Sequence, residues 1–178
     1  AHEITHVIID FDKQNLQIKI NPVIIKKFRD DAIRDMSIRL GSMFDDPRVD
    51  SFLMHKYNFD PDHFYAKVKL PDAKRHLTPS SEGQFDLDKL NQAMFYSQTK
   101  LQCELVKNEE AGREWGELER LYHRYRPNVE IMGNELYSMS NDIGYDTLEK
   151  QKLLFQSIIG KNYMIGGGWK LGDALHIE

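Results

Sequence analysis

The feature that most constrains the fold is the stretch 86–126, which contains no proline and is interrupted only by Gly112 and Gly116. Its apolar residues fall near helical spacing, which predicts one long helix or two helices joined near Ala111. Pro127 ends the stretch, because proline cannot continue a helix. A helix of this length exceeds what a small core covers, so we expect it to pack on a partner. The residues at helical spacing are Leu87, Leu90, Met94, Leu101, Leu105, Trp115, Leu118, Tyr122 and Tyr125.

The N-terminal part has the composition of a β-hairpin. Residues 4–11 are rich in β-branched and aromatic side chains, and residues 16–20 alternate apolar and polar. Turn-forming residues lie between them, so a hairpin over about 4–20 is predicted.

Two helices are predicted next, over 22–41 and 46–57. Each begins with a residue that can cap a helix, followed by a proline suited to the first turn. Glycine favours the position just after a helix end, which predicts where the first helix stops. The cap pairs are Asn21-Pro22 and Asp46-Pro47, and the predicted stop is Gly41.

The remaining segments are less regular. Residues 63–70 alternate apolar and polar and are predicted as a third strand, followed by a loop over 71–84. Residues 129–140 fit either a short helix or a strand. A helix is predicted over 147–160 with Asp146 as its N-cap, followed by a glycine-rich tail.

These elements predict an α+β fold, with the N-terminal hairpin packed against helices. We expect a small α+β region at 1–70, the loop 71–84 and a mostly helical region at 85–178, or a single domain that contains all three. The chain has 178 residues, enough to bury a core without disulfides or metals.

Composition excludes several classes of protein. The chain is 40% hydrophobic and 29% charged with a net charge of −4, so no global basic field draws it to nucleic acid. No apolar run approaches the length of a membrane span. Cys103 is the single cysteine, which fits a reducing compartment, so we expect a cytoplasmic or other intracellular protein.

Residues 2–6 read His-Glu-Ile-Thr-His and match the zinc-peptidase pattern H-E-x-x-H. The surrounding AHEITHVIIDF resembles the active-site helix of thermolysin-type metallopeptidases. The resemblance implies His2 and His6 as zinc ligands, Glu3 as general base and Asp46 or Glu135 as third ligand. However, the following Val-Ile-Ile favours a strand, in which the two histidines would lie about 13 Å apart, too far to share a metal. We therefore predict a strand and no metal or cofactor.

The segment 120–126 alternates aromatic residues with cations, as nucleic-acid surfaces do. The glycine-rich tail contains a tryptophan that can anchor it, and such a tail can dock on a neighbouring subunit. We name both as candidate binding sites, although acidic residues just before the segment 120–126 disfavour nucleic acid. The candidate residues are Arg120, Tyr122, Arg124, Tyr125, Arg126 and Trp169.

No complete catalytic set is evident in the sequence. We therefore predict a non-enzymatic interaction or assembly protein, a subunit of an oligomer or of a larger complex with a protein partner. The alternatives are a zinc metallopeptidase and a nucleic-acid-associated protein.

Overall fold

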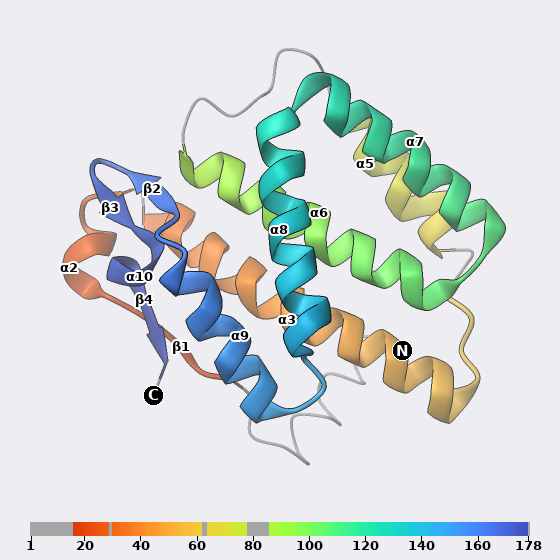
Figure 1. Cartoon of the computed structure of the whole chain (residues 1–178), viewed down its shortest axis with the longest axis horizontal. Helices are drawn as coiled ribbons and strands as arrows, with labels where there is room; N and C mark the ends of the chain where they lie inside the picture. The colour runs from red at the N-terminus through yellow and green to blue at the C-terminus, as the bar shows by residue number, and fades with distance from the viewer. Residues whose placement is uncertain (1–15, 29, 62–63, 78–85, 178) are drawn as a thin grey trace.

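The computed structural model describes residues 16–28, 30–61, 64–77 and 86–177, and these are mainly helical (Figure 1). Short strands make two small antiparallel sheets, so the α+β prediction holds only in part. The helices are α2 (Pro22–Ile25), α3 (Asp30–Tyr57), the π-helix η1 (Tyr65–Lys69), α5 (Leu70–His76), α6 (Asp86–Val106), α7 (Glu109–Tyr125), α8 (Pro127–Ile143), α9 (Leu148–Gly160) and α10 (Leu171–Ala174).

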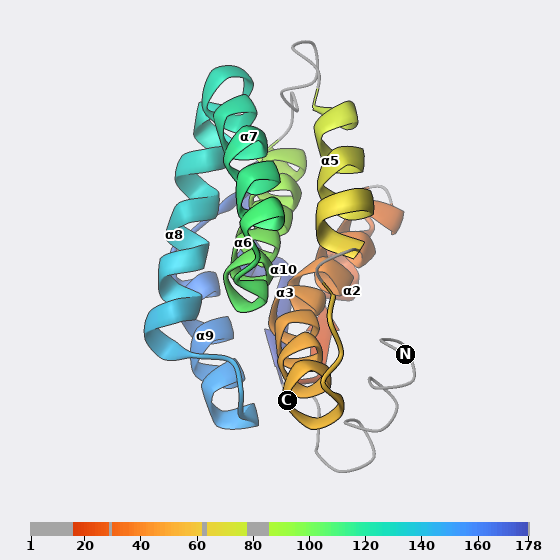
Figure 2. The same cartoon turned by 90° about the vertical axis from the view of Figure 1, so that its right-hand side faces the viewer.

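Helix α6 is the central element of the core. It packs on α3 on one side and on α8 on the other, while α7 packs against α5 and α8 (Figure 2). Because neighbours cover several of its faces, α6 buries polar as well as apolar side chains. Its buried residues are Leu87, Leu90, Ala93, Met94, Tyr96, Ser97, Gln98, Thr99, Leu101, Gln102, Cys103 and Val106.

The long helix predicted over 86–126 is divided into α6 and α7. The break lies at Lys107 and Asn108, not near Ala111. Lys107 has a φ of 52°, a left-handed conformation that ends α6. Asn108 then caps α7, because its Oδ1 accepts hydrogen bonds from the backbone N–H groups of Glu110 and Ala111. Helix α6 packs mainly on α3 and α8, and α7 packs on α5, α8 and α6. Neighbouring helices of the same chain therefore cover the apolar residues for which a partner was expected.

Helix α3 joins the two helices predicted over 22–41 and 46–57. Asn21 and Pro22 begin the separate short helix α2, as predicted. The predicted stop at Gly41 is wrong, because α3 continues through it, and Pro47 lies inside α3 rather than at a helix start. The core residues Ile33, Met36, Leu40, Met43 and Phe44 keep one helical stripe across Gly41, and burial of that stripe outweighs the cost of a glycine.

The strand predicted at residues 16–20 is confirmed as β1 (Ile18–Ile20). Its antiparallel partner is β4 (Leu175–Ile177), in which Ile18 lies opposite Ile177 and Ile20 opposite Leu175. The first strand of the predicted hairpin lies outside the described residues.

The third strand predicted over 63–70 is wrong where the structure describes it, since residues 64–69 belong to η1 and its cap. The described part of the predicted loop, 71–77, is also mostly helical, with Pro71 in the first turn of α5. The alternating pattern gave a wrong prediction because the buried residues of this segment do not alternate. Tyr65, Ala66 and Leu70 are buried, and Ala66 and Leu70 lie four residues apart on one helical face.

The C-terminal part follows the predicted helices more closely. Residues 129–140 lie in α8, and the helix predicted over 147–160 is α9, although its cap is Thr147 rather than Asp146. The glycine-rich tail is folded: β2 (Met164–Gly166) and β3 (Trp169–Lys170) pair around a turn at Gly167. The positive φ values of the tail glycines explain why this turn needs them.

Candidate ligand-binding site

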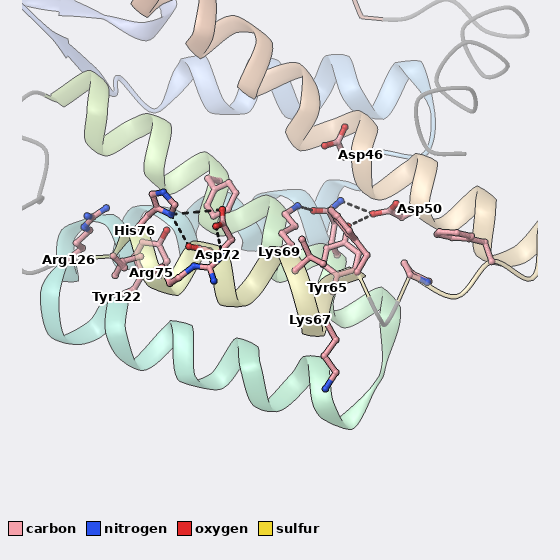
Figure 3. Close-up of a pocket in the computed structure, with 18 residues that line it drawn as sticks. Asp46, Asp50, Tyr65, Lys67, Lys69, Asp72, Arg75, His76, Tyr122 and Arg126 are labelled. Carbon is pink, nitrogen blue, oxygen red and sulfur yellow. Dashed lines mark hydrogen bonds and ion pairs between the residues drawn. The ribbon is translucent and has the colours of Figure 1, made fainter.

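A cleft of about 970 Å³ opens between α3, α6, α7 and the helical segment η1–α5 (Figure 3). Its walls are mostly apolar, and polar side chains gather toward its two ends. The lining residues are Asp46, Asp50, Phe59, Pro61, Phe64, Tyr65, Lys67, Val68, Lys69, Asp72, Ala73, Arg75, His76, Leu77, Phe95, Gln102, Tyr122 and Arg126.

The first end of the cleft is built around the carboxylate of Asp50, which is 4% exposed. The Tyr65 hydroxyl donates to Asp50 Oδ2 at 2.5 Å, and the Gln102 amide nitrogen donates to the same oxygen at 2.7 Å. Burial, reinforced by Asp50, raises the pKa of Tyr65 far above its ordinary value, so Tyr65 stays a neutral donor. The arrangement satisfies a charge that would otherwise be costly to bury.

Lys69 completes this end of the cleft. Its Nζ donates to the Gln102 side-chain oxygen at 2.7 Å. Because a carboxylate oxygen only accepts, the Gln102 amide nitrogen faces Asp50 and its oxygen therefore faces Lys69. The Lys69 ammonium also lies 5.2 Å from the centre of the Tyr65 ring and 5.8 Å from that of Phe95. Burial lowers the pKa of Lys69, although the nearby carboxylates of Asp46 and Asp50 oppose that effect.

The backbone that presents Tyr65 and Lys69 is the π-helix η1, which continues directly into α5. A π-helical turn is rare and often occurs at functional sites. Here it supplies four of the lining residues from one short segment, namely Tyr65, Lys67, Val68 and Lys69.

The second end of the cleft is basic. Figure 3 shows Arg75, His76 and Arg126 there, with Tyr122 beside them. Arg126 is only 6% exposed, and its Nη1 donates to the side-chain oxygen of Gln92. Arg75 donates to Asp72 Oδ1 at 2.9 Å, and this hydrogen bond lowers the pKa of Asp72.

Only part of the predicted binding segment belongs to the cleft. Tyr122 and Arg126 line it, and burial raises the pKa of Tyr122 to about 12. Arg120 and Arg124 are exposed to solvent, and Arg124 lies 5.2 Å from the Tyr125 ring centre. Trp169 does not line the cleft. It lies on β3 next to α10 and packs on the core.

The predicted metal-site residues are not assembled in the part of the chain that the structure describes. His2, Glu3 and His6 lie outside the described residues. Asp46 accepts a hydrogen bond from Gln98 at 2.5 Å, and Glu135 binds Tyr163 and Lys161. Among the described residues, no group of three histidine, cysteine or acidic side chains could hold a metal ion.

The sequence reasoning missed Tyr65, Lys69 and Gln102. Tyr65 and Lys69 lie in the segment wrongly predicted as a strand. A signal for Gln102 was present: Gln98 and Gln102 are four residues apart on a helix, and the apolar Met94 and Val106 lie one turn before and after them on the same face. Such a polar pair on a buried face indicates hydrogen-bond partners inside the fold.

Comparison with protein-family models, with curated proteins and with solved structures finds no match for this chain. Within the described residues, none of the helices combines the length and apolar character needed to cross a membrane.

Proposed function

We propose that this protein binds a small organic molecule that has an apolar body and an anionic group. The observation that carries the proposal is the cleft of about 970 Å³ with apolar walls and polar side chains at both ends. Small-molecule sites in proteins have this size and this distribution of polar groups. Phe95, Ala73 and Leu77 would contact the apolar body.

The basic end supports an anionic group on the ligand. Arg126 lines the cleft and keeps a permanent positive charge at this end. A guanidinium charge attracts a carboxylate, sulfonate or phosphate group. Arg75 and His76 lie at the same end, and Asp72 offsets part of their charge.

The test uses anilinonaphthalene sulfonate, a fluorescent probe with an apolar body and one anionic group. Val68 lines the cleft and is 50% exposed, so Val68→Glu adds a negative charge there without opening the core. We expect this variant to weaken probe binding roughly tenfold, which corresponds to about 1.4 kcal/mol. Ile131→Glu is the matched control, because Ile131 is 69% exposed on α8 and does not line the cleft.

The control should bind the probe as the wild type does. Equal weakening in Val68→Glu and Ile131→Glu would mean that the probe responds to overall charge. Unchanged binding in Val68→Glu would mean that it binds outside the cleft. Either result would overturn the proposal.

A second candidate function is the interaction or assembly role expected from the sequence. It is supported by three apolar side chains exposed at the cleft: Phe59 at 39%, Phe64 at 52% and Val68 at 50%. Such a group favours burial by another protein surface, for example a second copy of this chain. Sedimentation over a range of concentrations tests it: self-association should weaken in Phe64→Ser, and a monomer at all concentrations would count against self-association.

The remaining alternatives stay predictions with direct tests. A zinc metallopeptidase would bind zinc in the wild type and lose it in His6→Ala. Nucleic-acid binding would depend on salt and weaken when Arg120 and Arg124, both exposed, are changed together. Arg126 is too buried to contact a phosphate on the surface.

A further inference from the structure

Lys69 differs from other lysines of the cleft region in its hydrogen-bond partner. Lys67 pairs with Glu110, and Lys74 pairs with Glu114 and Glu117. Lys69 donates instead to the neutral amide oxygen of Gln102, which is held in place by Asp50. Its amine is therefore fixed in the cleft wall by an uncharged group.

The surroundings of the Lys69 amine favour its reaction as a nucleophile. The rings of Tyr65 and Phe95 lie beside it, which limits its access to water. Burial lowers its pKa, which increases the neutral fraction that can attack an electrophile. The charged and titratable groups near it are Asp46, Asp50, Cys103 and Arg39.

We propose that Lys69 captures the carbonyl group of an aldehyde or ketone ligand in the cleft as an imine. This inference rests on the proposed ligand-binding function of the same cleft. The neutral Nζ attacks the carbonyl carbon, and a carbinolamine forms after proton transfer from nitrogen to oxygen. The carbonyl oxygen then leaves as water with both amine protons, and a carbon–nitrogen double bond remains. No oxidant or reductant is needed, so the capture is reversible.

The hydrogen bonds around Lys69 also indicate which side chain reacts and which one positions it. The amide oxygen of Gln102 accepts a hydrogen bond from Lys69 Nζ, which holds the amine beside the rings of Tyr65 and Phe95 in the cleft wall. The Tyr65 hydroxyl is occupied by Asp50 and is kept neutral, so it does not compete as a nucleophile. Lys69 is thus the reacting group, and Gln102 is a positioning residue.

The test is reductive trapping with benzaldehyde and cyanoborohydride on the full chain near neutral pH. Peptide mapping then locates the benzyl group that reduction leaves on the modified lysine. We expect Lys69 to be modified roughly tenfold or more faster than Lys67, because a carbonyl held in the cleft reacts at a raised effective concentration. Lys67 is an internal control from the same helix: it also lines the cleft, but its side chain is 51% exposed and its Nζ pairs with Glu110.

Two further measurements make the test decisive. Lys69→Arg keeps the positive charge but cannot form an imine, so the fast phase of benzylation should disappear and no other lysine should take it up; a fast phase that persists would contradict the proposal. Benzyl alcohol has the same apolar body without a carbonyl, and it should compete with the trapping. If Lys69→Arg fails to fold, the peptide map of the wild type and the competition by benzyl alcohol still test the proposal.

The outcomes separate the two proposals. A Lys69 adduct that benzyl alcohol suppresses supports both. Chemical-shift changes at the cleft with benzyl alcohol, together with Lys69 labelling no faster than Lys67, would overturn the imine and leave the ligand site standing. Absence of any binding by benzyl alcohol or anilinonaphthalene sulfonate, together with no preference for Lys69, would overturn both.

Discussion

The contact between α6 and α8 depends on Gly133, and replacing this glycine by alanine should destabilise the fold. A Cβ at position 133 would lie 2.5 Å from Cδ1 and 2.9 Å from Cγ of Tyr96. Tyr96 cannot easily yield, because it is 0% exposed and its ring packs on Trp115 and Tyr122 with centroids 5.1 and 5.0 Å away. Its hydroxyl also donates to Glu119 at 2.8 Å.

The magnitude follows from two opposing effects. Forcing a methyl group into a packed core costs about 1–3 kcal/mol, and a contact this close at a fixed ring falls at the upper end. Alanine in place of glycine inside a helix raises the free energy of unfolding by about 1 kcal/mol. We therefore expect Gly133→Ala to lower the free energy of unfolding by about 2 kcal/mol, or to lower Tm by roughly 4–8 °C for a chain of this size.

Urea denaturation followed by circular dichroism measures this change as a shift in midpoint at constant slope. The control is Gly112→Ala in α7, where an added Cβ meets no atom within 4 Å. The control should gain up to about 1 kcal/mol. Equal stability changes in Gly133→Ala and Gly112→Ala would refute the reasoning, because helix propensity alone would then account for both.

Three other predictions concern single side chains. Asn108→Ala removes the cap of α7 and should cost about 1 kcal/mol in urea denaturation, with Asn108→Asp restoring most of it; no loss would mean that the cap is dispensable. Cys103 is 7% exposed and burial raises its pKa to about 12, so iodoacetamide should modify it slowly in the native protein and rapidly in urea, and equal rates would contradict the burial. Hydrogen bonds from Lys161 and Tyr163 lower the pKa of Glu135, so its stabilising effect should be present above about pH 4.3, the unfolded value, and be lost as pH falls through the lower folded value. The stability difference between wild type and Glu135→Gln should therefore shrink in acid, and a constant difference would exclude the titration.

Periodicity predicted which segments are helical better than it predicted where they end. The apolar spacing in 86–126 was correct, but the break occurs where Lys107 adopts a positive φ. Lysine has no preference for that conformation, whereas Asn108 beside it is a good cap. Gly112, which looked like the break, is tolerated inside α7 on its exposed side.

A proline led to the opposite error, a helix boundary predicted where the helix continues. Pro47 suggested a helix start, yet α3 passes through it. Tertiary packing decides this, because Met43 and Phe44 before the proline and Val49 and Leu53 after it are all buried. A rule based on local sequence takes no account of the apolar surface of α3 that is buried against the neighbouring α6.

The candidate site was the part of the structure that the sequence predicted least well. Its polar end joins Asp50 of α3, Tyr65 and Lys69 of η1, and Gln102 of α6, which are far apart in the chain. No local motif carries such an arrangement. Tyr122 and Arg126 were singled out as a binding segment, and the structure assigns them to the wall of a cleft that the sequence did not predict.

The pairing of β1 with β4 has a consequence for how the chain is made. During synthesis β1 emerges early, and its partner Leu175–Ile177 emerges only after all the helices described between them. Contacts between such distant segments must overcome the entropy of closing a very long loop. We therefore expect the helices to assemble first on the ribosome, while the edge of β1 that β4 later covers stays open to incorrect pairing with other chains until β4 has emerged.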